Sequence, residues 1–309
     1  MSASAFRMMA RTLVVACLAA TASAADPDPG FTVTPLAGSV SLIQGYECNI
    51  TVSAGDDGIV MVDTCGPTKV AEQLLAAVKR LSEKPFRFVI NTHAHGDHTG
   101  ANMFFQNLAP VVAHHNVRKR MAAGNEKTGD KPRAPEALPA VTFDSEMILH
   151  LNGEEIRLLH LPPGHTDGDV VVFFQKANVV CMGDEFISPA ASFGDRHYGG
   201  SMLGLIAALE LVLPQIPADA TIVPGHGKIS TRADVARGLE VLKQMKAEVE
   251  AGVRNGKTLE QIQAERPFDQ WRSSVPEWSS SDKSLDRWVR DFYREIAPEP
   301  AQPPPKVPN

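Results

Sequence analysis

The sequence predicts an α/β fold, because short apolar runs of strand type alternate with segments that have the spacing of amphipathic helices. Residues 31–63 hold several β-rich runs separated by turn residues. Residues 67–81 then place apolar side chains three and four positions apart, as a helix with one buried stripe does. Polar residues follow several later strand-like runs, which predicts a functional site over the ends of a sheet.

The first half of the chain opens with strands that we expect to pair as an antiparallel sheet. The predicted strands are 31–35, 40–43, 49–53 and 59–63, with a turn at 54–58. The elements expected next are a helix at 67–81, a buried strand at 86–90, a short helix from 100 to 108 and a strand at 110–113. Residues 118–139 are polar and contain three prolines, so we expect a flexible loop that could wall the site.

The second half continues the alternation of strands and helices. Residues 141–161 indicate two strands joined by a turn at Asn152-Gly153. The elements expected after them are strands at 169–174, 179–182 and 220–223 and helices at 202–213, 231–254 and 285–296. Thr258 and Gln261 have the spacing of a capping box that begins one more short helix. The C-terminal helices are expected to cover the sheets and to offer a surface for a homodimer.

The N-terminus is typical of a signal peptide. Arg7 and Arg11 precede an apolar run at 12–20 and the small-residue stretch Ala22-Ser23-Ala24. This order predicts cleavage after Ala24 and a periplasmic or secreted protein. The apolar run is shorter than the roughly 20 residues that a membrane-spanning helix needs, so we expect no membrane anchor.

Charge argues against partners that are themselves anionic. The full chain has a formal charge of −6 at pH 7, and loss of residues 1–24 removes two arginines and brings it to −8. An acidic chain is a poor partner for nucleic acid, so we expect a small-molecule substrate. We expect a single domain at 25–297, followed by a disordered proline-rich tail at 298–309.

Three cysteines remain after the predicted cleavage, which is an odd number. Cys48 opens one predicted strand and Cys65 follows its hairpin neighbour, so a disulfide between them is one interpretation in an oxidising compartment. Two unpaired thiols packed as small apolar groups is the other. Cys181 lies within a predicted strand and is expected to be buried and free.

The strongest functional signal is Asn-Thr-His-Ala-His-Gly-Asp-His-Thr-Gly at 91–100, directly after the apolar run at 86–90. In extended backbone alternate side chains point the same way, so His93 and His95 can face one point. Gly96 then lets the chain turn and present Asp97 and His98 beside them. Imidazole and carboxylate are ligands that zinc accepts, so this stretch predicts a metal site.

Three further motifs follow in order. They are Pro163-Gly164-His165-Thr166, Gly183-Asp184 and Pro224-Gly225-His226-Gly227. With the His-x-His-x-Asp-His stretch, they resemble the metallo-β-lactamase superfamily over roughly residues 31–250. The resemblance implies an αββα four-layer sandwich with a metal site at its edge. The histidines His114, His115, His150 and His160 match no motif, and we interpret them as structural.

The resemblance also implies a dinuclear ligand set. One ion would bind His93, His95 and His165, the second would bind Asp97, His98 and His226, and Asp184 would bridge them. Two Zn²⁺ ions are expected, with iron or manganese as alternatives, and a shared hydroxide would act as nucleophile. Asp97 would transfer protons. Asp63, which ends the strand at 59–63, would support a ligand imidazole by a hydrogen bond.

The sequence constrains the type of bond that is cleaved less than it constrains the metal ligands. Zinc β-lactamases resemble this chain but place cysteine or serine where Asp184 stands, and the best-known branch has a carboxylate-binding lysine where Ile187 stands. Asp184 resembles the bridging aspartate of glyoxalase II and general hydrolases, which indicates an ester, thioester, lactone or amide. The alternatives are a β-lactamase, a mononuclear iron persulfide dioxygenase and a non-catalytic periplasmic accessory protein. His197 and Tyr198, in the long segment 185–200, are candidate substrate contacts.

Overall fold

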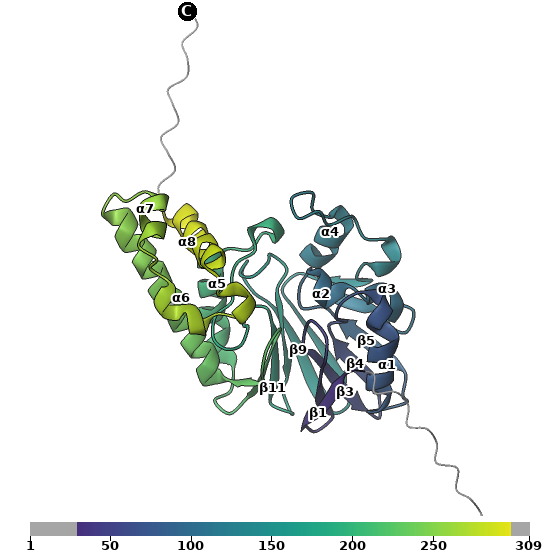
Figure 1. Ribbon diagram of the computed structural model, residues 1–309. Helices are drawn as coiled ribbons and strands as arrows, with labels where there is room; N and C mark the ends of the chain where they lie inside the picture. Colours follow the sequence, from purple (N-terminus) through teal and green to yellow (C-terminus); the bar gives the residue numbers. More distant parts are fainter. Residues whose placement is uncertain (1–29, 298–309) are drawn as a thin grey trace, which may run out of the picture.

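The computed structural model describes residues 30–297, so the predicted signal peptide and C-terminal tail lie outside the described residues. The strands form two sheets that face each other, with helices on both outer sides (Figure 1). The seven-stranded sheet runs in chain order, β1 (Thr32–Ala37), β2 (Val40–Gln44), β3 (Ile50–Gly55), β4 (Gly58–Val62), β5 (Phe86–Ile90), β6 (Val111–His114) and β7 (Val141–Phe143).

The six-stranded sheet has the order β13-β12-β11-β10-β9-β8. Its strands are β8 (Glu146–Leu151), β9 (Glu154–His160), β10 (Val170–Phe174), β11 (Val179–Gly183), β12 (Thr221–Pro224) and β13 (Ser230–Thr231). The α-helices are α1 (Ala71–Lys79), α2 (Gly96–Thr99), α3 (Asn102–Phe105), α4 (His115–Ala123), α5 (Met202–Val212), α6 (Arg232–Arg254), α7 (Leu259–Ala264) and α8 (Asp282–Ile296).

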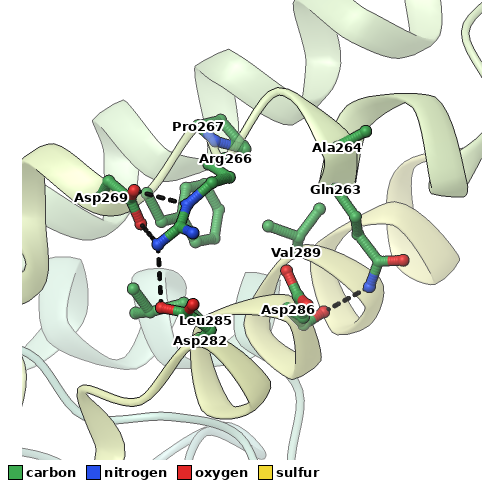
Figure 2. A pocket seen from close by; sticks show the side chains of 10 residues that line it. Gln263, Ala264, Arg266, Pro267, Asp269, Asp282, Leu285, Asp286 and Val289 are labelled. Atoms are coloured by element: carbon green, nitrogen blue, oxygen red, sulfur yellow. Dashed lines mark hydrogen bonds and ion pairs between the residues drawn. The ribbon is translucent and has the colours of Figure 1, made fainter.

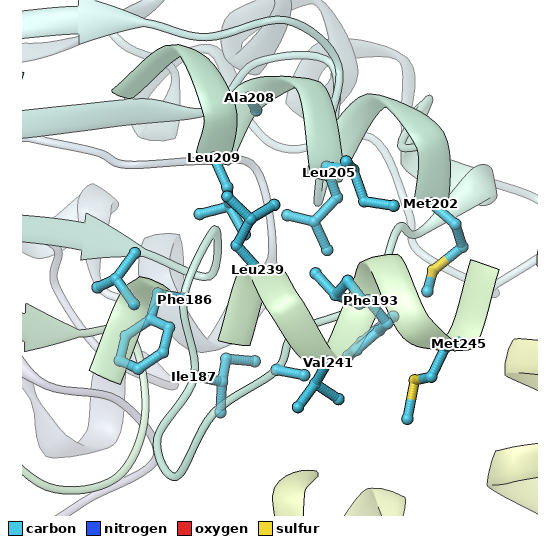
Figure 3. Packing of buried hydrophobic residues seen from close by; sticks show 14 of the residues in the cluster. Phe186, Ile187, Phe193, Met202, Leu205, Ala208, Leu209, Leu239, Val241 and Met245 are labelled. Atoms are coloured by element: carbon cyan, nitrogen blue, oxygen red, sulfur yellow. The ribbon is translucent and has the colours of Figure 1, made fainter. Parts of the chain in front are cut away.

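The buried clusters confirm the predicted four-layer sandwich. Apolar side chains of both sheets, such as Val60 on β4 and Val172 on β10, share the cluster between the sheets. A second cluster lies between the first sheet and α1, which contributes Leu74. The largest cluster packs the second sheet against α5, α6 and α8, and Figure 3 shows Leu205 and Leu239 in it.

The sheets are also tied together at one edge by the predicted Asn152-Gly153 turn. Both residues have positive φ, 58° and 70°, which the tight turn between β8 and β9 requires. The side-chain Nδ2 of Asn152 donates to the Gly58 carbonyl at 3.0 Å, and the side-chain Oδ1 of Asn152 accepts from the backbone N–H of Asp57 at 3.1 Å. The turn of one sheet is therefore hydrogen-bonded to the turn of the other.

The C-terminal helices are held by their caps and by a surface ion network. Thr231 and Thr258 both form capping boxes, and the second confirms the predicted pairing with Gln261. Arg266 contacts Asp269 and Asp282 and so joins the segment after α7 to the start of α8 (Figure 2).

None of the helices within residues 30–297 combines the length and the apolar character that a membrane-spanning segment needs.

One expectation needs correction. The segment 118–139 is predicted to be irregular, but its first residues belong to helix α4, because His114 caps that helix and Val117 and Met121 are buried on it.

Of the two interpretations of Cys48 and Cys65, the structure agrees with unpaired thiols. Cys48 and Cys65 are free buried thiols joined by a hydrogen bond, which lowers the pKa of Cys65 to about 7.

Candidate metal centre

The first group of candidate ligands comes from three strand ends. His93 and His95 follow β5, His165 follows β9 and Asp184 follows β11. One ligand atom from each of these four residues lies within 4.8 Å of all the others. Strands β9, β10 and β11 are neighbours in one sheet and β5 lies in the facing sheet, so the group spans the sandwich edge.

The second group lies beside the first. Asp97 and His98 are on the short helix α2, and His226 follows β12; their ligand atoms also lie within 4.8 Å of one another. Asp184 contacts both groups. Its Oδ2 is 3.5 Å from His165 Nε2 and 3.3 Å from His226 Nε2. The structure therefore brings all seven sequence-predicted ligands together, with Asp184 between the two groups.

Most of the clustered histidines are oriented by an acceptor that meets Nδ1. These contacts are His98 Nδ1 to Asp63 Oδ2 at 2.8 Å, His165 Nδ1 to the Phe193 carbonyl at 2.8 Å and His226 Nδ1 to the Glu47 carbonyl at 2.7 Å. A neutral imidazole that donates from Nδ1 has its lone pair on Nε2. In each of these three residues Nε2 faces the cluster, as a metal ligand should.

His95 is turned the other way. Its Nδ1 lies 3.0 Å from His165 Nε2, within the cluster, and its Nε2 lies 3.3 Å from Asp195 Oδ2. The ring of Tyr198 meets the His95 ring nearly at right angles, with centroids 4.4 Å apart. Asp195 and Tyr198 therefore fix the orientation of His95. Sequence reasoning did not single out Asp195, because nothing in its local sequence marks it.

Asp63 connects two ligand loops. Besides His98, it accepts hydrogen bonds from the backbone N–H and the hydroxyl of Thr92, both at 2.8 Å. Its backbone has a positive φ of 65°, which turns the chain at the end of β4. The carboxylate thus lies under the start of the His93 loop and beside α2, in the supporting place that the resemblance implied.

The charges in the cluster favour a cation. Burial alone would raise the pKa of the Asp184 carboxyl, but the nearby imidazoles of His98 and His226 hold it well below its usual range. Burial would lower the pKa of His226, yet Asp184 and Asp97 raise it to about 10. Two ionised carboxylates therefore draw positive charge into a buried site.

The donor atoms also fit a metal. Asp184 Oδ1 is buried and has no hydrogen-bond partner among the described residues, although it lies 3.3 Å from His98 Nε2. Three pairs of imidazole nitrogens approach to between 3.0 and 3.2 Å, which places lone pairs against one another unless a proton or a cation lies between them. Nitrogen and oxygen donors gathered in this way are a set that zinc, iron and manganese accept.

One glycine makes the close approach of two ligand loops feasible. A Cβ at Gly225 would lie 1.8 Å from Asp184 Oδ1, and the Gly225 amide donates to the Gly183 carbonyl at 2.7 Å. Any side chain at this position would displace the central carboxylate. The glycine before His226 therefore belongs to the ligand arrangement.

A cavity of about 540 Å³ opens over the cluster. It is lined by Glu47, His95, Asp97, His165, Asp184, Phe193, His226 and Trp278. Sequence reasoning missed Glu47, Phe193 and Trp278. Of the two candidate substrate contacts, Tyr198 is buried against His95 and its hydroxyl donates to Asp130, while His197 is exposed. Neither residue lines the cavity.

Comparison with known proteins decides the family. Residues 43–226 match the model of the metallo-beta-lactamase superfamily. The chain therefore belongs to the metallo-β-lactamase superfamily. This range begins in β2 and ends at His226, so it contains both candidate ligand groups but not the helices from α6 onward.

The relatives within this superfamily have different activities. The chain is 26% identical over 159 residues to the alpha subunit of 2,4-dinitroanisole O-demethylase from Nocardioides sp., covering 51% of this chain and 47% of that protein. It is 29% identical over 159 residues to hydroxyacylglutathione hydrolase from Nitrosococcus oceani, covering 50% and 53%. The matches thus span about half of each of these relatives.

Solved structures show the same fold. A metallo-beta-lactamase from Pontibacter korlensis superposes with a TM-score of 0.60 at 20% identity, covering 69% of this chain and 99% of that one. At this level of identity the likeness concerns the fold alone. The superfamily includes hydrolases and binds metal ions, and the buried histidine and aspartate cluster is the candidate metal site of this member.

Proposed function

We propose that this chain is a dinuclear zinc hydrolase that cleaves a small ester, thioester, lactone or amide. The observation that carries the proposal is the place of Asp184 between two complete groups of ligands. A carboxylate in that position can bridge two ions. The seven ligands would hold a pair of zinc ions, which would supply Lewis acidity and lower the pKa of a bound water towards neutrality.

The cavity lining supports water as the nucleophile. No serine, cysteine or lysine is among the described residues that line the cavity, so the lining offers no hydroxyl, thiol or amine to attack the substrate in place of water. Asp97 is the more exposed of the two clustered carboxylates, with 31% of its side chain accessible against 6% for Asp184. Asp97 can therefore orient the attacking water and pass a proton to the leaving group.

The lining also favours general hydrolysis over β-lactam hydrolysis. A β-lactam carries a carboxylate, and a lysine or arginine beside the metals would bind it by a charge-assisted hydrogen bond. No lysine or arginine is among the described residues that line the cavity. Ile187, at the place where the resembled β-lactamases have lysine, is completely buried in the apolar cluster beside α6 (Figure 3).

Elemental analysis joined to a substrate panel tests the proposal. We expect two zinc ions per chain, turnover of at least one among a thioester, an aryl ester and a lactone, and less turnover of nitrocefin. Asp184→Asn should lower both the zinc content and kcat/KM, because an amide bridges two cations poorly. The control is His150→Gln, which alters an exposed histidine on β8 and should change neither.

Other outcomes of the same experiment would contradict the proposal. One iron per chain, with no second metal, would indicate an oxygenase. Two zinc ions without turnover across the panel would indicate an accessory role. Nitrocefin as the best substrate would identify a β-lactamase.

We also infer that the hydrolase is exported. The support is the order of charged, apolar and small residues in the first 24 positions, which lie outside the described residues. N-terminal sequencing of protein taken from the periplasm should begin at Ala25. A mature chain that begins at Met1 would contradict export.

A further inference from the structure

We propose that Trp278 and Phe193 form one wall of the substrate site and bind an aromatic group of the substrate beside the bond that is cut. This inference rests on the hydrolase proposed above and names the substrate class more narrowly. Trp278 lies on the short 3-10 helix η6 (Glu277–Ser279), more than 50 residues after the family match ends at 226. The segment outside that match thus contributes a residue to the cavity over the candidate metals.

The rings in this wall leave the indole open. The Trp278 and Phe193 centroids are 5.8 Å apart with an interplanar angle of 78°, and those of Trp278 and His226 are 6.5 Å apart at 73°. Neither neighbour stacks on the indole, and Trp278 is 58% exposed. An exposed flat indole in a cavity is complementary to a flat aromatic group, which can stack on it.

The wall is fixed by its surroundings. Phe193 is 9% exposed, meets the His165 ring at 5.0 Å between centroids, and has the Arg287 guanidinium 4.7 Å from its own centroid. The loop that carries Phe193 is hydrogen-bonded to the segment before Trp278, since the Ala191 amide donates to the Ser274 carbonyl at 3.1 Å. A rigid wall loses little entropy when it binds a flat ring.

The other residues of the lining indicate that an aromatic group binds at the Phe193 and Trp278 wall. Apart from Phe193 and Trp278, every residue that lines the cavity is an acid or a histidine, and most of them belong to the candidate metal cluster. Glu47 adds a third carboxylate to Asp97 and Asp184. Among the described residues of the lining, an apolar ring therefore has only the Phe193 and Trp278 wall to bury against, which places the reacting carbonyl towards the metals.

The test compares matched esters in the zinc-loaded full-length enzyme. Benzyl acetate and ethyl phenylacetate carry the ring on the leaving group or on the acyl group, and ethyl acetate carries none. We expect Trp278→Ala to lower kcat/KM for one of the aromatic esters by about tenfold through KM, the factor that stacking of ~1.4 kcal/mol represents. Ethyl acetate should lose less than about twofold, and Trp278→Phe should restore part of the aromatic preference.

Equal effects on all three esters, or no effect on any, would overturn the inference. A second readout does not depend on turnover: phenylacetamide should change the tryptophan fluorescence of the wild type, because Trp278 is the most exposed indole, but not that of Trp278→Phe. That variant keeps the partly buried Trp271 and the buried Trp288, and neither lines the cavity. The same change in both proteins would also overturn the inference. If no ester is hydrolysed but the fluorescence results hold, the hydrolase proposal fails and the aromatic site stands.

Discussion

At the scale of single residues, the acceptor bonded to Nδ1 of His98, His165 or His226 sets which ring nitrogen faces the cluster. Asp63 shows this most clearly, because one carboxylate serves His98 and both polar groups of Thr92. Both of its oxygens accept hydrogen bonds, and the carboxylate is buried. A substitution that keeps the shape of this side chain but replaces one acceptor oxygen with a donor NH2 group should therefore weaken metal binding.

The first prediction concerns Asp63→Asn. The amide NH2 would face a donor, either from Thr92 or from His98, so we expect zinc affinity to fall by about 10- to 100-fold. Competition with a chromophoric chelator measures this. Asp144→Asn is the matched control, because Asp144 also accepts from a histidine, His115, at 2.8 Å but is 88% exposed. Equal losses in the two variants would contradict the role given to Asp63.

The second prediction concerns His114, which is buried and stacks on His160 with centroids 3.6 Å apart. Burial, with the neighbouring His160 and His115, lowers the pKa of His114 to about 4 from a usual 6.5. Between these values the unfolded chain holds the proton more tightly, so the folded state loses stability as pH falls from 6.5 to 4.

His114→Gln removes this proton uptake. We expect the free energy of unfolding in urea to fall less between pH 7.5 and pH 5 in the variant than in the wild type, when both have the same zinc content. The variant can be less stable overall without affecting this comparison. An unchanged pH dependence would show that His114 does not titrate in this range.

At the scale of elements, α6 holds the segment that carries Phe193. Gly238 lies inside α6, where a Cβ would come within 1.6 Å of the Ala190 carbonyl oxygen. The helix therefore approaches the backbone after β11 as closely as a glycine allows. This contact, rather than helix propensity, explains a glycine in the middle of a 23-residue helix.

The third prediction is that Gly238→Ala destabilises the protein, although alanine is the better helix former by about 1 kcal/mol. The methyl group must displace the Ala190 backbone, at a cost of roughly 1–3 kcal/mol in the free energy of unfolding. Ala247→Ser, on the exposed side of the same helix, should change stability by less than about 0.5 kcal/mol. A stabilised Gly238→Ala variant would contradict the packing described here.

At the scale of the whole molecule, the C-terminal helices complete the largest apolar cluster. Trp288 on α8 is completely buried among side chains of α5, α6 and the second sheet. Its indole N–H has no hydrogen-bond partner among the described residues. The helices after 226 therefore contribute to folding as well as to the cavity wall.

The fourth prediction separates two contributions of Trp288 to the free energy of unfolding, that of its size and that of its polar N–H group. Trp288→Ala should lower the free energy of unfolding by about 3–5 kcal/mol, because it leaves a large cavity. Trp288→Phe should cost much less, since it removes an unpaired buried N–H along with part of the volume. Trp278→Ala is the control for an exposed indole. Equal costs for Trp288→Ala and Trp278→Ala would contradict the burial.

The fold and the ligand set could be predicted largely from sequence, because ligands at strand ends are marked by short motifs such as His93-Ala94-His95 and Gly183-Asp184. Residues that act through space have no such mark. Asp195 reaches His95 from 100 positions away, and Trp278 comes from a segment without a motif. Helix α4 was missed because polar side chains cover most of its surface.

The most direct test of the central claim is an anomalous difference map at the zinc absorption edge, from crystals grown with zinc. The account predicts two peaks about 3.5–4 Å apart. One should be bound by His93, His95 and His165, the other by Asp97, His98 and His226, with Asp184 touching both. A single peak, or a pair of peaks that Asp184 does not bridge, would contradict it.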